Sequence, residues 1–384
     1  MVGLLLSVPV TAVAATPGPT SPPVAPSAPP PAAAVSGLAL GPGRLPSCTG
    51  VVEALPQRAR LAQRLMVGVD GSDPAGTAQT VQQTGIGGIF IGGNATNLLR
   101  NQSLREVQAR ARIPLAVAVD DEGGRVQRID GLDGDLPSAR EMSALDPLRV
   151  RELGRDRGQE LRGYGITVNF APTVDVSRQR AGAVIGDRSF GNDPAKVVRY
   201  AGAFALGQRE SGVFTVLKHF PGHGHADGDS HQGRVTTPPL EQLRRDDLQP
   251  YAELLGPGGQ LAGTGVDSRT GVMVGHLDVP GLTGELPSSL TPAVYALLRD
   301  EYRFDGVVYT DDLGAMKAVT GTFALPEAVE RALAAGADVA LWSGGGRVSQ
   351  VLDRVEDALA AGRLDRALND RAVARIVAAK GVCS

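Results

Sequence analysis

Short apolar segments alternate with amphipathic ones along most of this chain. From residue 60 onward, the segments with strand character cover residues 65–69, 88–91, 115–119, 167–170, 213–217, 272–275, 306–309 and 338–342. Most of them are apolar at every position, which is typical of parallel strands that are buried on both faces. The pattern therefore predicts a parallel sheet with helices between its strands.

Helical periodicity is clearest at residues 147–163, 194–211, 240–255, 292–302 and 326–335. Several of these segments begin with Asp-Pro or Thr-Pro, which supplies an N-cap followed by a proline in the first helical position. Eight strands with intervening helices predict an α/β fold, a single (β/α)₈ barrel of the TIM type. A doubly wound open sheet is the alternative from pattern alone, although no glycine-rich dinucleotide or phosphate-binding fingerprint follows an early strand.

The first 47 residues differ in composition from the rest. Residues 1–15 are apolar and include Ala12-Val13-Ala14, which resembles a signal-peptide cleavage site, although a positively charged start is missing. Pro9 interrupts this stretch well short of the ~20 residues that cross a bilayer, so no membrane span is expected. Residues 16–47 hold ten of the 27 prolines and predict a disordered tether. We expect an exported protein, extracellular or associated with the cell wall, whose folded part covers residues 48–384.

Charge and cysteine content narrow the possibilities further. The net charge is −3 and no run of Lys or Arg occurs, which argues against a nucleic-acid partner. Cys48 and Cys383 lie at the two ends of the expected folded part, which predicts a disulfide in an exported protein, with two unrelated thiols as the alternative. A lipid anchor on Cys48 is a weaker possibility, because the preceding residues only loosely resemble a lipobox. The sequence does not determine the oligomeric state, and a monomer is our default expectation.

Four of the five histidines fall between Lys218 and His231, in a glycine-rich stretch that also carries acidic residues. Histidine titrates near neutral pH, so such a cluster is suited to proton transfer or charge binding. Polar residues also follow other predicted strands, namely residues 120–125, Asp175, His276 and Asp311-Asp312. In a barrel the carboxyl ends of the strands meet at one mouth, so these side chains are expected to share one site.

Five strings occur in order along the chain: Asp120-Asp121-Glu122-Gly123-Gly124-Arg125, Gly186-Asp187-Arg188-Ser189-Phe190-Gly191, Lys218-His219-Phe220-Pro221-Gly222-His223-Gly224, Asp229-Ser230-His231 and Thr310-Asp311-Asp312-Leu313. They resemble glycoside hydrolase family 3, and within it the bacterial β-N-acetylglucosaminidase branch, over roughly residues 55–375. The Lys-His-Phe-Pro-Gly-His-Gly string with a nearby Asp-Ser-His is highly specific. The resemblance implies a retaining β-N-acetylhexosaminidase that removes terminal β-linked GlcNAc from peptidoglycan fragments, with no metal or other cofactor.

By position, Asp311 resembles the family's nucleophile, which attacks the anomeric carbon in a retaining glycosidase. Its neighbour Asp312 is the competing candidate. Adjacent residues of a strand point to opposite sides, so only one of the two can face the mouth. The other is expected to have a structural hydrogen-bonding role.

For the acid, the resemblance implies His231 held by Asp229, in place of a second carboxylate. An aspartate in this position fixes the imidazole tautomer and raises its basicity. The eighth predicted strand ends near Trp342, which leaves about forty residues and no second domain that could supply another acid. A surface Asp-Ser-His turn is the alternative.

The resemblance assigns sugar binding to Asp120, Arg128, Arg188, Lys218, His219 and His276. Arg188 and Lys218 have an alternative role as structural ion pairs. Asp175 is a less certain candidate, Glu122 and Arg125 are expected to pair with each other, and His223 is expected to brace the Pro-Gly turn.

Other activities stay open from the sequence. Within the enzyme class these are a family 3 β-glucosidase and a retaining glycoside phosphorylase, since neutral imidazole repels phosphate less than a carboxylate does. His223-Gly224-His225-Ala226-Asp227 begins like the signature of a metal-dependent hydrolase, but Gly228 stands where that signature needs histidine. A catalytically inactive sugar-binding barrel is the last alternative.

Overall fold

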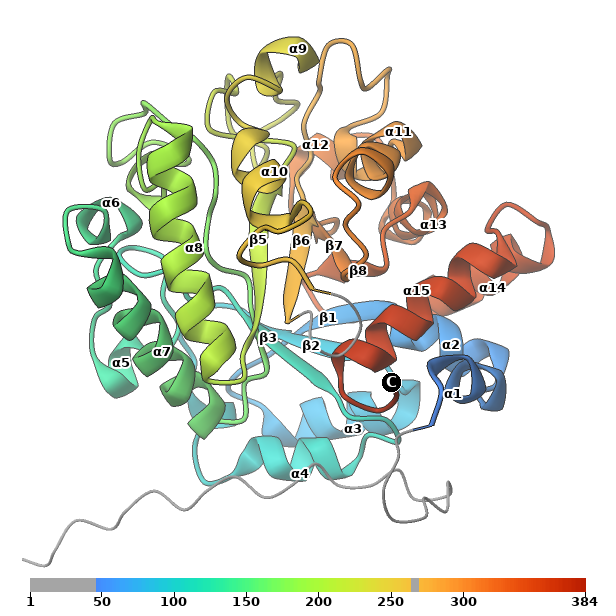
Figure 1. Cartoon of the computed structure of the whole chain (residues 1–384). Helices are drawn as coiled ribbons and strands as arrows, with labels where there is room; N and C mark the ends of the chain where they lie inside the picture. The colour runs from blue at the N-terminus through green and yellow to red at the C-terminus, as the bar shows by residue number, and fades with distance from the viewer. Residues whose placement is uncertain (1–45, 264–268) are drawn as a thin grey trace, which may run out of the picture. The chain divides into compact units, whose positions relative to one another are not determined.

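Eight parallel strands form a closed barrel in chain order in the computed structural model, which describes residues 46–263 and 269–384 (Figure 1). The strands are β1 (Leu65–Val69), β2 (Gly88–Ile91), β3 (Ala116–Val119), β4 (Val168–Asn169), β5 (Phe214–Phe220), β6 (Thr270–Val274), β7 (Val308–Asp312) and β8 (Val339–Trp342). The barrel closes where β1 pairs with β8. The predicted (β/α)₈ fold is confirmed, and the open sheet is excluded.

Two strands are longer than the sequence pattern predicts. β5 continues to Phe220 and β7 to Asp312, so each extends three residues beyond its predicted end. The prediction stopped where charged residues begin, because buried parallel strands are ordinarily apolar. The chain instead keeps Lys218, His219 and Asp311 within the strands, so these side chains are carried on rigid backbone.

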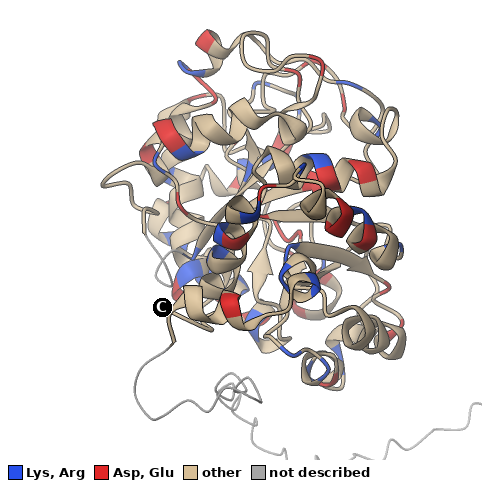
Figure 2. Cartoon of the chain, turned by 90° about the vertical axis from the view of Figure 1, so that its right-hand side faces the viewer, with Lys and Arg blue, Asp and Glu red and all other residues tan. Residues whose placement is uncertain are grey.

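Helices lie between the strands and cover the outside of the barrel (Figure 1). They are α1 (Cys48–Ala54), α2 (Gln57–Gln63), α3 (Pro74–Thr84), α4 (Ser103–Ala109), α5 (Asp130–Asp133), α6 (Ala139–Met142), α7 (Pro147–Gly163), α8 (Pro194–Glu210), α9 (Leu240–Leu243), α10 (Gln249–Leu255), α11 (Pro292–Ala296), α12 (Lys317–Thr320), α13 (Leu325–Ala335), α14 (Val348–Ala360) and α15 (Arg366–Ala379). Short turns of helix are η1 (Asn97–Leu99), η2 (Gly186–Arg188), η4 (Ser288–Leu290) and η5 (Leu297–Glu301). Figure 2 shows acidic and basic positions interspersed on the outer helices of this view.

The caps explain where the long helices begin. Asp146 accepts a hydrogen bond from Leu148 N (2.8 Å), and Asp193 accepts one from Ala195 N (3.1 Å), as expected for Asp-Pro starts.

The predicted helix at 240–255 is wrong as one element, because it divides into α9 and α10. The second helix begins at Gln249, so Pro250 lies in its first turn, where the missing N–H removes no helical hydrogen bond.

Aromatic side chains fill the barrel from alternate strand positions. Phe170 stacks on Phe90 with ring centroids 5.8 Å apart and meets Tyr309 edge-on at 5.4 Å. The pairing of β7 with β8 shifts register between Tyr309 and Asp312, so the inward direction of Tyr309 does not by alternation alone fix the direction of Asp311.

The two ends of the described chain meet at the amino ends of the strands. Cys48 at the start of α1 forms the predicted disulfide with Cys383, beyond α15. Ser384 N also donates to Pro46 O (3.1 Å), so the last residues of the expected tether belong to the folded part. The expected signal peptide and the rest of the tether lie outside the described residues. Among the described residues no helix is long and apolar enough to cross a bilayer.

Replacing Cys48 and Cys383 with serine is expected to lower the free energy of unfolding by about 2–4 kcal/mol, because the disulfide restricts the unfolded chain across 335 residues. Urea unfolding followed by the fluorescence of Trp342, the single tryptophan, measures this difference. The reduced wild-type protein is the control and should match the double variant. Equal midpoints for oxidised and reduced protein, or two free thiols in unreduced unfolded protein, would contradict the prediction.

Candidate active site

The carboxyl ends of β3, β5 and β7 bring charged side chains together at the mouth of the barrel. Lys218 on β5 is buried and donates from Nζ to Asp120 Oδ1 (2.5 Å) and Glu122 Oε1 (2.6 Å), both of which follow β3. Glu122 also accepts two hydrogen bonds from Arg188, at 2.7 Å and 2.8 Å. Two cations and two carboxylates thus form one connected network.

Glu122 is paired differently from the sequence expectation. Arg125 does not contact it and instead pairs with Asp187 (2.8 Å), while Glu122 bridges Lys218 and Arg188. The expected Glu122–Arg125 pair is therefore wrong. Burial raises the pKa of Glu122, but the two adjacent cations outweigh burial and hold that pKa well below its usual range. Glu122 is therefore a permanent carboxylate that positions both cations.

His219 is held by a buried carboxylate that the sequence only weakly suggests. Asp175, fully buried, lies with Oδ2 2.7 Å from His219 Nδ1 and accepts from His223 N with its other oxygen (2.7 Å). Arg188 Nη2 lies 3.4 Å from His219 Nε2. Since guanidinium can only donate, Nε2 is the acceptor and Nδ1 carries the proton toward Asp175. These contacts fix one tautomer of His219.

A break in strand register explains how two consecutive residues of β5 both reach the site. The pairing of β5 with β6 shifts between Leu217 and Phe220, the interval that contains Lys218 and His219. In a regular strand these neighbours would point to opposite faces, whereas a bulge redirects one of them. A similar shift occurs between Tyr309 and Asp312 in the pairing of β7 with β8.

Asp311 is the carboxylate that faces the mouth from β7. It is 8% exposed, and one of its oxygens accepts a hydrogen bond from Asp312 N (2.8 Å). Burial raises the pKa of Asp311, but the hydrogen bond from Asp312 N and the positive charge of Lys218 oppose burial, and the pKa lies below its ordinary value. Asp311 is consequently ionised at neutral pH and available to react with an electrophilic carbon.

Both carboxylate oxygens of Asp312 accept hydrogen bonds from nearby backbone N–H groups. One oxygen accepts from Gly314 N (2.8 Å) and Ala315 N (3.1 Å), and the other accepts from Ser343 N (3.2 Å). Asp312 therefore has the structural hydrogen-bonding role that was expected for one member of the pair. It joins the loop after β7 to the loop after β8.

His276 lies behind this turn, 1% exposed, with both ring nitrogens occupied. Its Nε2 lies 3.0 Å from Asp312 O and its Nδ1 lies 2.7 Å from Ser289 Oγ. A carbonyl can only accept, so Nε2 carries the proton and Nδ1 accepts from the serine hydroxyl. Burial lowers the pKa of His276, which keeps it neutral. As placed, His276 supports the end of β7 and has no free ring nitrogen for a sugar hydroxyl.

The loop after β5 presents the predicted acid pair. His231 Nδ1 lies 2.9 Å from Asp229 Oδ1, and the His231 side chain is 62% exposed. The buried Ser230 between them attaches the loop to the segment after β7, because Ala318 N donates to Ser230 O (3.1 Å). This hydrogen bond joins the loop to the segment that follows Asp311. With Nδ1 held by Asp229, Nε2 is the ring nitrogen of His231 that is left for another partner.

Arg128 and His225 complete the set of sequence candidates. Arg128 donates from Nη1 to Gln127 O (2.7 Å), while its Nε is buried with no hydrogen-bond partner. His225 Nδ1 lies 2.8 Å from Asp247 Oδ2, so its partner is Asp247 and not His223 or Asp227. In the described part of the chain no group of three His, Cys, Asp or Glu side chains is arranged to hold a metal ion.

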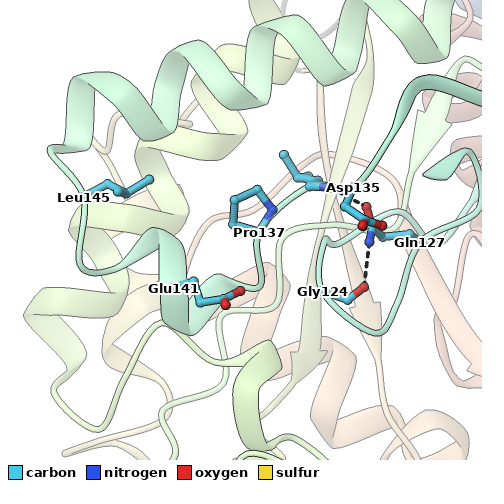
Figure 3. Close-up of a pocket in the computed structure, with 7 residues that line it drawn as sticks. Gly124, Gln127, Asp135, Pro137, Glu141 and Leu145 are labelled. Atoms are coloured by element: carbon cyan, nitrogen blue, oxygen red, sulfur yellow. Dashed lines mark hydrogen bonds between the residues drawn. The ribbon is translucent and has the colours of Figure 1, made fainter.

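A shallow pocket of about 560 Å³ lies next to the loop after β3. Gly124, Gln127, Asp135, Pro137, Glu141 and Leu145 line it (Figure 3). Gln127 spans its base by donating to Gly124 O (2.7 Å). It contains none of the candidate catalytic residues, so we assign the chemistry to the charged mouth and not to this pocket.

The chain is similar to known glycosidases over most of its length. Residues 57–379 match the family described as "Glycosyl hydrolase family 3 N terminal domain". Beta-hexosaminidase LpqI of Mycobacterium tuberculosis is 48% identical over 340 residues, which are 86% of this chain and 84% of that protein. The Beta-hexosaminidase of Pseudomonas aeruginosa is 36% identical over 275 residues, which are 68% of this chain and 76% of that protein.

Solved structures agree with this similarity. The structure titled "M tuberculosis LpqI" has a TM-score of 0.81 at 47% identity, covering 86% of this chain and 96% of that one. A glycoside hydrolase family 3 beta-N-acetylglucosaminidase from Paenibacillus sp. str. FPU-7 has a TM-score of 0.77 at 32% identity, covering 86% of this chain and 63% of that one.

The depressed pKa of Glu122 leads to a prediction about stability. Its carboxylate stabilises the fold fully above its unfolded pKa of 4.5, and this contribution is lost as the pH falls below that value. Glu122→Gln should lower the free energy of unfolding at pH 7 by about 3–5 kcal/mol, because two buried cations lose a partner. The variant should also lose less stability than the wild type between pH 5 and pH 3, measured by urea unfolding at each pH.

The matched control is Glu152→Gln, which removes a carboxylate from an exposed pair with Arg149. Exposed pairs contribute about 0–1 kcal/mol, so this variant should follow the wild-type curve. Parallel stability curves for the wild type and Glu122→Gln would show that the pKa of Glu122 is the same in the folded and unfolded protein, which would contradict the prediction.

Proposed function

The chain belongs to glycosyl hydrolase family 3 and is a glycoside hydrolase, and from this premise we propose that it is a retaining β-N-acetylhexosaminidase with Asp311 as nucleophile. The observation that carries the proposal is the environment of Asp311. It is the one buried carboxylate described at the mouth that pairs with no Lys, Arg or His and keeps an oxygen outside the described hydrogen bonds. A retaining glycosidase needs such a group below the anomeric carbon.

In the first step, Asp311 attacks the anomeric carbon and forms a glycosyl ester as the bond to the leaving oxygen breaks. His231 gives its proton to that oxygen. In the second step, His231 takes a proton from water, the water attacks the same carbon, and the ester bond breaks to release Asp311. Two inversions return the β configuration to the sugar.

The Asp229–His231 contact supports this use of histidine. With Nδ1 held by Asp229, Nε2 is the nitrogen that exchanges a proton with substrate and water. Burial alone would raise the pKa of Asp229, but its bonds from His231 outweigh burial and lower it, so the aspartate stays charged. The carboxylate therefore orients the ring and stabilises its cationic form.

Hydroxyl recognition follows from the remaining hydrogen-bonding capacity of the network. Lys218 uses two of its three protons on Asp120 and Glu122, which leaves one for a sugar oxygen. Asp120 has a second oxygen that can accept from a hydroxyl, and Arg128 has guanidinium N–H groups besides the one that donates to Gln127 O. His219, which is held in one tautomer by Asp175 and Arg188, lies beside these side chains. We assign these side chains to the terminal sugar.

We propose GlcNAc-containing peptidoglycan fragments as the substrate and an exported location for the enzyme. The Cys48–Cys383 disulfide supports export, since disulfides form in oxidising compartments. The choice of GlcNAc is supported by likeness to proteins named beta-hexosaminidase and beta-N-acetylglucosaminidase. Aryl β-glycosides of GlcNAc, GalNAc and glucose, assayed with and without phosphate, test it. Faster turnover of the glucoside, or a requirement for phosphate, would overturn it.

Asp311→Ala should abolish detectable turnover of an aryl β-GlcNAc glycoside, because no other group can form the ester. A 5-fluoro glycosyl inhibitor should label Asp311 in the wild type, as located by peptide mass spectrometry. The first-formed product should have the β configuration by NMR. Label on Asp312, or an α-configured first product, would reject the assignment.

His231→Ala should slow cleavage of a natural disaccharide by about 10²–10⁴-fold, because a poor leaving group needs a proton. Formation of the ester from an activated aryl glycoside should be much less affected, and azide should restore turnover once ester hydrolysis limits the rate. Asp229→Asn should show a milder form of the same pattern. Equal losses on both substrates without azide rescue would mean that His231 is not the acid.

A further inference from the structure

A second pocket of about 540 Å³ lies at the opposite end of the barrel, at the amino ends of β7 and β8. Phe304 and Asp305, which precede β7, and Ala335 and Gly336, which precede β8, form part of its lining. Helix α15 contributes Arg371 and Arg375, and Arg299 and Arg303 come from η5 and the turn that follows. None of the residues assigned to the active site contributes to it.

The lining carries four arginines against two aspartates, and the existing ion pairs do not use all of this positive charge. Arg299 is committed to the fold, because it donates to Phe304 O, Gly306 O and Asp338. Arg375 pairs with Asp305 (2.8 Å) and also contacts Asp338 (3.2 Å). Asp338 thus pairs with both Arg299 and Arg375, and Asp305 pairs with Arg375. Asp300 is the remaining aspartate of the lining.

The side chains of Arg303 and Arg371 have no hydrogen bond or ion pair with any residue in the described ranges. Both line the pocket beside two arginines that are already paired. Arg303 also has a φ of 55°, two residues beyond Glu301, where η5 ends. Glycine adopts this conformation most easily at a helix end, so the chain keeps a charged side chain where a smaller residue would cost less.

We propose that this pocket binds a phosphate dianion, either free or as the terminal group of a small phosphorylated molecule, with Arg303 and Arg371 as its ligands. Guanidinium groups present paired donors that match phosphate oxygens, and such charge-assisted bonds are the stronger ones. The volume leaves room for an organic group attached to the phosphate. The site lies at the other end of the strands from Asp311, so it is independent of the proposed glycosidase reaction.

The experiment is isothermal titration of the full disulfide-bonded chain with inorganic phosphate, at constant ionic strength set by chloride. Arg303→Gly and Arg371→Gln should each weaken phosphate binding at least about fivefold, because each removes a charge-assisted contact. Arg303→Gly also suits the left-handed backbone, so loss of folding should not obscure the result. Asp300→Asn should strengthen binding, since it removes the unpaired negative charge of the lining.

Arg110→Gln is the matched control, because Arg110 is exposed at the end of α4 and forms no ion pair with a residue that the structure describes. It changes the net charge equally and should leave phosphate affinity unchanged. Turnover of the aryl glycoside should be the same in all four variants, so failure of the proposed function does not affect this test. Absence of saturable phosphate binding, or equal weakening by Arg110→Gln and Arg371→Gln, would overturn the proposal.

Discussion

The contact of Glu122 with both Lys218 and Arg188 is the interaction on which the rest of the mouth depends. Two cations buried at the end of a barrel would repel each other and any neighbouring positive group. One ionised carboxylate between them removes that repulsion and fixes the direction of both side chains. Desolvation makes such a cluster costly unless every member is paired, so its geometry has little freedom.

This arrangement also explains why one carboxylate differs from the others. Asp120 and Glu122 each contact Lys218, Asp175 is taken by His219, and Asp312 is taken by backbone amides. Asp311 is close enough to Lys218 for that positive charge to lower its pKa, yet it forms no direct ion pair with Lys218 or Arg188. A nucleophile must be charged but not neutralised, and the surrounding pairs provide that condition.

Sequence patterns identified the barrel and the shared mouth because apolar strands are periodic and their polar ends stand out. They located the disulfide because only two cysteines are present. They did not identify Lys218 and Arg188 as the partners of Glu122, because β5 and η2 are far from Glu122 in sequence and approach it only in the folded chain. Arg125, the partner that was expected, is close to Glu122 only in sequence. The extension of β5 through Lys218 and His219 was missed because a register shift has no signature in hydrophobicity. Asp175 was undervalued because a single acidic residue after a strand carries no motif.

The disulfide has a mechanical consequence as well. Cys48 and Cys383 lie side by side at the end of the barrel away from the mouth, with α1 packed against α15. A pulling force applied at Pro46 therefore reaches the first and the last helix at the same moment. Tension on this end of the chain is therefore shared between α1 and α15, on the side of the barrel opposite the mouth.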